Sequence, residues 1–248
     1  MNTNYPTVTT IVLRQHLEAA IGGSSTDQCV PSTSSIERSL KRTELKRKRC
    51  TFLSNAQNPV EVYDHMARMA NIDVDDIINI DETSANSKKF RPTHGRGIGE
   101  VVIPEFRIGE KMYSAIAALT TAGFLPCTKI YDSACDSVSI QSYLNGLEPF
   151  VLQDSVCLLD NASVNVCEDS LQVVDRVFNG RWARNAAYSP RLAPIERGFS
   201  LVWRLVQQRW EEAQRDPIRV LEECFRYYEV GQPGGIACSG FFNVYRRN

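Results

Sequence analysis

Two short apolar runs, each ending in an aspartate, set the strongest limit on the fold of this chain. The sequence reads IINID at 77–81 and SVCLLD at 155–160. Runs of this length, closed by a turn-forming acid, are typical of buried strands. In α/β folds, ligands converge at the carboxyl ends of the strands. We therefore expect Asp81 and Asp160 to be held rigidly at one edge of a central sheet.

The segments around these runs alternate between strand and helix patterns. Further strands are expected at 111–119, 124–131 and 181–187, and helices at 58–70, 137–147 and 195–210. Strands first, followed by strand–helix alternation, indicate a mixed α/β domain. The chain has 248 residues, which suffice for one large domain or two small ones. No apolar run approaches the roughly 20 residues of a membrane helix, so we expect no membrane partner.

The amino-terminal part has a different pattern. Residues 9–21 read as an amphipathic helix ended by two glycines, and a second helix opens near Pro31 with good N-cap residues. Two short helices around a turn, the second one basic, are typical of a helix-turn-helix. We expect residues 1–50 to form a partial DNA-binding region of this type, and residues 51–74 to form a helical linker.

The second of these helices leads into a strongly basic segment. Residues 36–49 carry a net charge of +5, whereas the whole chain carries −1. Such a segment suits contact with DNA phosphates, although many charge runs are solvated faces without a ligand. The stretch 41–49 also suits a nuclear import signal, so we expect a nuclear protein. The candidate DNA-binding residues are Arg38, Lys41, Arg42, Lys46, Arg47, Lys48 and Arg49.

A third acid, Glu196, lies at the start of the helix expected at 195–210. Pro194 suits the first helical turn. Taken alone, Glu196 would be interpreted as a carboxylate that stabilises the helix dipole. Together with Asp81 and Asp160 it would complete a hard-oxygen site that suits Mg²⁺ or Mn²⁺. Two such ions about 4 Å apart can activate the attacking oxygen and stabilise the leaving oxygen at phosphorus.

Other site chemistries find little support in the sequence. The eight cysteines include no C-x-x-C pair, and the three histidines have no ligand spacing, which argues against a zinc site. Neither a G-x-S-x-G nor a G-x-x-x-x-G-K-[ST] motif occurs. The glycine-rich stretch 95–99 lacks the preceding strand and following helix of a nucleotide site.

The order of these landmarks resembles the Tc/mariner superfamily of transposases and its DDE endonuclease domain. Thirty-five residues separate Asp160 from Glu196, close to the spacing typical of the superfamily. The similarity covers about residues 75–212. The motifs that carry it are IINIDET at 77–83, SAIAAL at 114–119, LLDNAS at 158–163 and YSPRLAPIE at 188–196.

The resemblance implies a fold, a site and a substrate. The fold would be a ribonuclease-H-like mixed sheet flanked by helices at 75–215, preceded by the small helix-turn-helix segment and followed by a helical tail at 216–248. Asp81, Asp160 and Glu196 would be both catalytic and metal-binding, with two Mg²⁺ or Mn²⁺ ions. The enzyme would cut double-stranded DNA at transposon ends and join it to target DNA, working as a homodimer.

Three features depart from the family pattern. Asn165 stands near the place where the family often has a histidine, and Ala193 replaces the usual asparagine before Pro-Ile-Glu. A single helix-turn-helix precedes the catalytic region, so we expect an N-terminally truncated transposase. Two alternatives stay open: a catalytically inactive, transposase-derived DNA-binding protein, and a nuclease for RNA–DNA hybrids on the same fold.

Overall fold

The computed structural model describes residues 31–43, 56–86, 90, 111–160 and 167–246, together with Arg14 and Leu17. The chain divides into two compact units, Met1–Leu53 and Ser54–Asn248. All the strands found among the described residues belong to the larger unit.

The smaller unit contains the helix α2 (Thr33–Arg42). Its N-cap is Ser32, whose side chain accepts a hydrogen bond from the Ser35 backbone N–H. This confirms the helix expected to open near Pro31. Of the helix expected over 9–21, Arg14 and Leu17 are helical and the other residues lie outside the described part of the chain.

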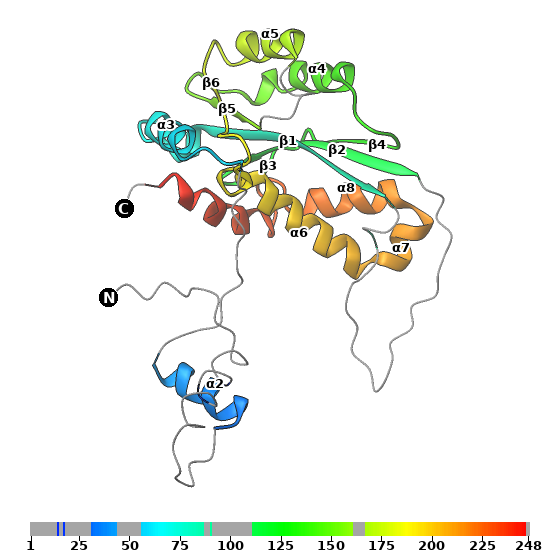
Figure 1. The fold of residues 1–248 in the computed structure, drawn as a ribbon. Coiled ribbons are helices and arrows are strands. Elements are labelled where there is room, and N and C mark those ends of the chain that lie inside the picture. The colour runs from blue at the N-terminus through cyan, green and yellow to red at the C-terminus, as the bar shows by residue number, and fades with distance from the viewer. Residues whose placement is uncertain are drawn as a thin grey trace. The chain divides into compact units, whose positions relative to one another are not determined.

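A six-stranded mixed sheet forms the centre of the larger unit (Figure 1). Its order is β3-β2-β1-β5-β6, and β4 also pairs with β2. β1 is antiparallel to β2 and parallel to β5, which is in turn parallel to β6. This is the mixed α/β sheet expected from the sequence. The strands are β1 (Ile77–Asn86), β2 (Met112–Thr120), β3 (Gly123–Phe124), β4 (Lys129–Tyr131), β5 (Val156–Leu159) and β6 (Trp182–Arg184).

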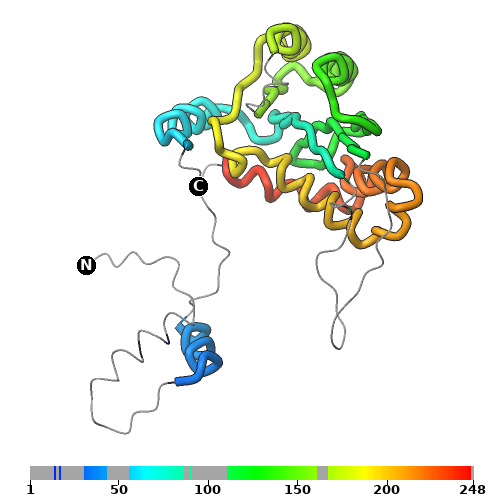
Figure 2. Tube along the Cα trace, turned by 45° about the vertical axis from the view of Figure 1, so that its right-hand side comes forward, coloured from blue at the N-terminus to red at the C-terminus, as the bar shows by residue number. Residues whose placement is uncertain are grey.

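Helices cover both faces of the sheet. On one face, α4 (Ser137–Asn145) and α5 (Glu168–Val177) lie side by side in both views (Figures 1 and 2). On the other face lie α6 (Pro194–Gln208), α8 (Pro217–Tyr227) and the 3-10 segment η4 (Gly235–Val244). No helix within the described residues is long and apolar enough to cross a membrane. The larger unit also contains α3 (Pro59–Met69), η1 (Val74–Asp76), η2 (Glu148–Phe150), η3 (Pro190–Leu192) and α7 (Trp210–Arg215).

The central strand β1 is buried on both faces because its side chains alternate between two hydrophobic clusters. Ile78 and Ile80 belong to the cluster that includes α4 and α5. Ile77 and Ala85 belong to the cluster that includes α6, α8 and η4. Burial of each large aliphatic side chain contributes about 1.5–3 kcal/mol. These contacts fix β1 between the two helical layers and leave its odd-numbered residues facing α6.

Three elements differ from the sequence-based expectation. The strand expected to close at Asp81 continues to Asn86, so Asp81 lies within β1 and not at its end. The strand expected over 124–131 is divided into β3 and β4, which both pair with β2. Pro126 lies between them, and proline cannot donate to a strand ladder. The sequence analysis did not predict α5, although Val174 and Val177 on this helix are buried against the sheet.

Gly198 in α6 provides a test of this packing. A Cβ there would lie 2.8 Å from the Phe124 ring and 3.3 Å from Leu119 Cδ2. Phe124 is fully buried and packs against the rings of Phe199 and Phe225, so it has no room to withdraw. Gly198→Ala should therefore destabilise the larger unit by about 1–2 kcal/mol, as overpacked cores do. This loss would exceed the helix-propensity gain of at most about 1 kcal/mol.

The matched control is Gly240→Ala in η4, where the nearest atom to an added Cβ is Asn243 Nδ2 at 4.0 Å. It should change the stability by less than about 0.5 kcal/mol, as expected at an unstrained exposed position. Chemical denaturation of the two variants measures both effects. A Gly198→Ala protein as stable as wild type would contradict the close approach of α6 to β3.

Candidate active site

Asp81 and Asp160 follow paired residues on neighbouring parallel strands. Ile80 of β1 is in register with Leu159 of β5, and each aspartate is the next residue of its chain segment. Neighbouring strands lie about 4.8 Å apart. Asp81 is buried, with 6% of its surface exposed, and Asp160 is half-buried. The structure thus places these two predicted site residues side by side at the edge where β5 ends, with Asp81 inside β1 and not at its end as expected.

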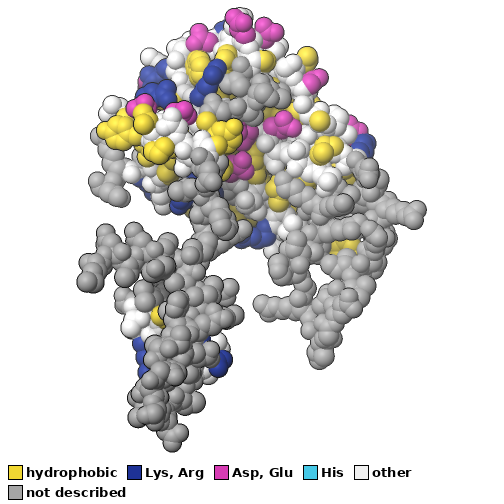
Figure 3. Space-filling model, in the orientation of Figure 1, with side chains coloured by type: hydrophobic (Ala, Val, Ile, Leu, Met, Phe, Trp, Pro, Cys, Tyr) yellow, Lys and Arg dark blue, Asp and Glu magenta, His cyan; other side chains and the backbone are white. Residues whose placement is uncertain are grey.

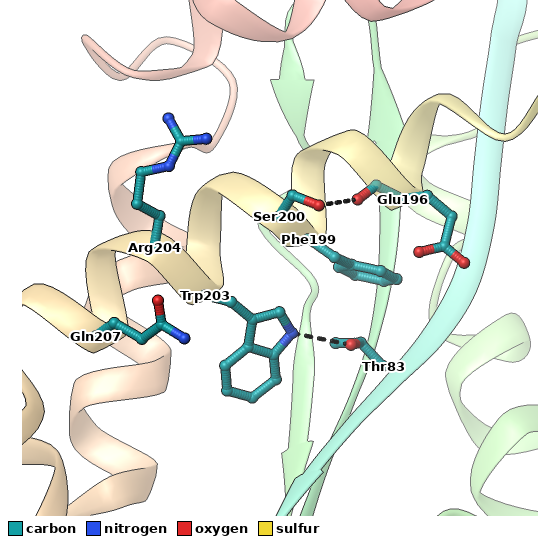
Figure 4. A pocket seen from close by; sticks show the side chains of 7 residues that line it. All are labelled: Thr83, Glu196, Phe199, Ser200, Trp203, Arg204 and Gln207. Carbon is teal, nitrogen blue, oxygen red and sulfur yellow. Dashed lines mark hydrogen bonds between the residues drawn. The ribbon is translucent and has the colours of Figure 1, made fainter. Parts of the chain in front are cut away.

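Glu196 comes to the same edge from the first turn of α6. Its side chain is exposed, and its backbone carbonyl accepts a hydrogen bond from Ser200 Oγ at 2.9 Å. The Glu196 carboxylate lies beside β1 in the close view of the helix (Figure 4). The third acid therefore stands on the side of the sheet toward which Asp81 faces.

Asp160 and Glu196 act electrostatically on Asp81. Burial raises the pKa of Asp81 well above its usual value, and the negative charges of Asp160 and Glu196 raise it further. The backbone N–H of Glu82 donates to Asp81 Oδ1 at 2.7 Å and acts in the opposite direction. Burial and like charges both disfavour ionisation of Asp81 and outweigh the bond from Glu82.

Such an environment suits a hard divalent cation by the chemistry of its donors. Carboxylate oxygens are the ligands that Mg²⁺ and Mn²⁺ prefer, and a cation would offset the charge repulsion. In the part of the chain that the structure describes, no three His, Cys, Asp or Glu side chains are gathered as an assembled ligand set. Asp160 and Glu196 lie near enough for their charges to affect Asp81. The carboxylates of all three residues are donors that fit the cation.

An open groove of about 320 Å³ extends from Glu196 along one side of α6 (Figure 4). Its walls are both polar and aromatic, and of the three acids Glu196 lines it. Across this groove, Trp203 Nε1 donates to Thr83 Oγ1 at 3.0 Å, which joins α6 to β1. The groove is lined by Thr83, Glu196, Phe199, Ser200, Trp203, Arg204 and Gln207.

The sequence analysis missed two polar residues of β1 that flank Asp81. Asn79 and Thr83 are buried on the same face of the strand, and both form hydrogen bonds to α6. The signal was present in the sequence, because polar residues occupy alternate positions of N-x-D-x-T in a strand that opens on an apolar run. Strand periodicity places alternate residues on one face.

A buried contact also fixes the loop that leads into α6. His65 of α3 is fully buried, and its Nδ1 lies 3.0 Å from the carbonyl oxygen of Arg184. Its Nε2 lies 2.9 Å from the Tyr245 hydroxyl, which donates to the carbonyl of Leu192. Burial lowers the pKa of His65, whereas the bond to the Arg184 carbonyl raises it. This His65–Tyr245 contact holds the segment just before Glu196.

The predicted DNA-binding residues divide between described and undescribed parts of the chain. Arg38, Lys41 and Arg42 are exposed on α2, where Figure 3 shows basic side chains on the surface of the smaller unit. Lys46, Arg47, Lys48 and Arg49 lie outside the described residues.

Comparison with known proteins identifies the fold. No protein-family model matches the sequence, and no curated protein matches it. Among solved structures, the catalytic domain of the Mos1 mariner transposase matches with a TM-score of 0.55 at 13% identity, over 80% of this chain and 93% of that one. The same domain with raltegravir and Mn matches with a TM-score of 0.54 at 14% identity, over 79% and 92%. The Mos1 strand transfer complex matches with a TM-score of 0.52 at 15% identity, over 94% and 74%.

These matches show that the chain has the ribonuclease-H-like fold of the Mos1 catalytic domain, with a six-stranded mixed sheet flanked by helices. The expected α/β fold class is therefore confirmed. At these identities the similarity establishes the fold and leaves the activity to be argued from the site.

Because Asp81 is buried, we expect its ionised carboxylate to lower the free energy of unfolding. Its pKa is raised in the folded state, so the folded chain binds the proton more tightly than the unfolded chain does. The stabilising effect of protonated Asp81 is complete below about pH 4 and is lost as the pH rises through the raised pKa. At pH 7 without divalent cations, Asp81→Asn should raise the Tm, by roughly 2–4 °C for each kcal/mol gained.

Thermal melts of both proteins between pH 4 and pH 8 measure this difference, which should grow with pH. The control is Asp132→Asn, because the exposed Asp132 pairs with Lys111 and its pKa is lowered. Asp132→Asn should lower the Tm, and only slightly. A lower Tm for Asp81→Asn at pH 7 would contradict the charge repulsion inferred for this edge.

Proposed function

We propose that this protein is a Tc/mariner-type DNA transposase that cleaves transposon ends and transfers their strands to target DNA, with Asp81, Asp160 and Glu196 as the catalytic, metal-binding triad. The observation that carries the proposal is that Asp81 and Asp160 follow the paired residues Ile80 and Leu159 of neighbouring parallel strands. Glu196, in the first turn of α6, lies near enough for its charge to raise the pKa of Asp81. The ribonuclease-H-like fold shared with the Mos1 catalytic domain supports the proposal.

In this proposal, the acids hold two Mg²⁺ or Mn²⁺ ions, which when bound activate the attacking oxygen and stabilise the leaving oxygen at phosphorus. Asp81 supplies the most rigid donor, since its strand is buried on both faces. Asp160 directly follows β5, the parallel neighbour of that strand. Glu196 approaches from the other layer and stays exposed, where it can adjust to the DNA strand.

The alternative is a catalytically inactive, transposase-derived protein that binds DNA. One observation favours the enzyme. A buried carboxylate with two like charges nearby destabilises a fold, so a purely structural role would be served better by an apolar residue or an amide at position 81. This cost is understandable where a cation binds.

We further propose that double-stranded DNA is the partner and that Arg38, Lys41, Arg42, Lys46, Arg47, Lys48 and Arg49 contact its phosphates. The net charge of +5 over residues 36–49 supports this assignment. The same basic run suits nuclear import, and a homodimer would hold two transposon ends together.

The central test is Asp160→Asn. Calorimetry with Mn²⁺ should detect binding to the wild-type chain in the micromolar to millimolar range, and the substitution should abolish it. Nicking of supercoiled plasmid DNA in Mn²⁺ should fall in parallel. Loss of an outer partner of a metal ligand costs roughly 10–100-fold in affinity or activity, so loss of a ligand should cost at least as much.

The control is Glu148→Gln, which neutralises an exposed acid on η2. It should leave Mn²⁺ binding and nicking unchanged. If wild type and Asp160→Asn bound Mn²⁺ equally and neither nicked DNA, the three acids would have no catalytic role. The alternative of an inactive DNA-binding protein would then be supported.

The basic segment is tested by the salt dependence of DNA binding. Replacing Arg47, Lys48 and Arg49 by Ala should reduce the slope of log K against log salt by up to about 0.9 for each lost phosphate contact. Fluorescence anisotropy with a labelled duplex at several salt concentrations gives this slope.

As a matched control, alanine at Lys111, Arg176 and Arg181 removes the same charge from the larger unit. The slope should then stay at the wild-type value. An unchanged slope for the first triple variant would rule out phosphate contact by those residues.

A further inference from the structure

A single buried carboxamide joins the three elements that carry the acids. Asn79 of β1 has no exposed surface. Its Nδ2 donates to the carbonyl oxygen of Leu158 in β5 at 3.0 Å. Its Oδ1 accepts from the backbone N–H of Ile195 in α6 at 2.9 Å. One planar group therefore holds β1, β5 and the start of α6 at fixed separations.

Each of these three points lies next to an acid. Asn79 precedes Asp81 by two residues on the same face of β1. The carbonyl that accepts from Asn79 Nδ2 belongs to the residue two before Asp160. The N–H that donates to Asn79 Oδ1 belongs to the residue directly before Glu196. A shift of this amide would change the spacing of all three carboxylates together.

The N-cap residue of α6 supplies no side-chain cap. This residue is Ala193, which offers no side-chain acceptor, and Pro194 has no N–H to donate. The N–H of Ile195 is consequently the first helical donor that needs a partner, and a residue 116 positions earlier in the chain supplies it. The first helical N–H of α6 is thus capped from the sheet and not by the loop that precedes the helix.

Only a group with both a donor and an acceptor can make this link. The Asn carboxamide has an NH₂ for the Leu158 carbonyl and a C=O for the Ile195 N–H. A carboxylate lacks the donor, and leucine, although of similar size, lacks both. Because all three partners are buried, water does not readily replace the lost bonds.

We propose that Asn79 is the positioning residue of the acidic edge: its carboxamide sets the place of Glu196 relative to Asp81 and Asp160. The catalytic meaning of this role rests on the function proposed above, whereas the geometric role does not. Asn79 acts through the backbone atoms beside the acids and does not itself contact DNA or a cation.

The test compares Asn79→Leu with Thr83→Val in the full chain. Both remove a hydrogen bond between the same face of β1 and α6, but Thr83 bonds to Trp203, two helical turns beyond Glu196. The first measurement is amide hydrogen exchange at Ile195 without metal. Asn79→Leu should speed this exchange at least tenfold, and Thr83→Val should change it less than twofold.

The second measurement is the Mn²⁺ dissociation constant by calorimetry. Asn79→Leu should weaken binding at least tenfold while circular dichroism shows a folded chain, and Thr83→Val should leave the constant within a factor of two. Introducing Ala193→Ser into the Asn79→Leu protein gives α6 a local N-cap acceptor. This second change should restore both the slow exchange and a large part of the Mn²⁺ affinity.

If Asn79→Leu does not fold, Asn79→Ser keeps one polar atom in the site and is compared with Thr83→Val on the same measurements. Unchanged exchange at Ile195 in a folded Asn79 variant would overturn the proposal. Equal weakening of Mn²⁺ binding by the Asn79 and Thr83 variants would overturn it as well, because the effect would then be general. A wild-type chain that binds no Mn²⁺ would overturn the proposed function, while the exchange result would still decide the role of Asn79.

Discussion

The parallel pairing of β1 with β5 is the contact on which the geometry of the acidic edge depends. Its register places Ile80 beside Leu159, so the aspartates that follow them reach the edge of the sheet side by side. A shift of one residue would turn one of them toward the opposite layer, since side chains alternate along a strand. The apolar side chains on both faces of β1 fix this register. Packing in the core therefore determines where charge is concentrated at the edge.

The acidic edge also illustrates the opposition between stability and function. Asp81 is buried with two like charges nearby, and the Glu82 backbone N–H donates a hydrogen bond to it. The hydrophobic layers compensate for this unfavourable placement. A fold with less apolar burial around β1 could not keep a carboxylate there, because an unpaired buried charge is strongly destabilising.

The sequence predicted the elements that carry the chemistry better than it predicted their connections. β1, β5 and α6 were expected because apolar runs and helical periodicity are local signals. The structure places Asp81 and Asp160 side by side, whereas their joint role with Glu196 as a triad stays a prediction. The division of 124–131 at Pro126 and the existence of α5 were missed. Tertiary pairing with β2 decides the first, and a short amphipathic pattern gives only a weak signal for the second.

The hydrogen bonds of Asn79 could not be predicted, because they join residues 79 and 116 positions apart and no local pattern encodes such a distance. The alternation of N-x-D-x-T marks these polar residues as unusual for a buried strand, but it does not identify their hydrogen-bond partners. Those partners are determined by the packing of α6 against β1.

The His65–Tyr245 contact has a consequence for how the chain reaches its native state. It joins residues 180 positions apart, farther than any pairing within the sheet, and it holds the loop before α6. Contacts between such distant residues carry a large entropic cost of loop closure and slow folding. We expect the sheet to form first and the loop before Glu196 to be ordered last, so that the two aspartates are in place before the glutamate joins them.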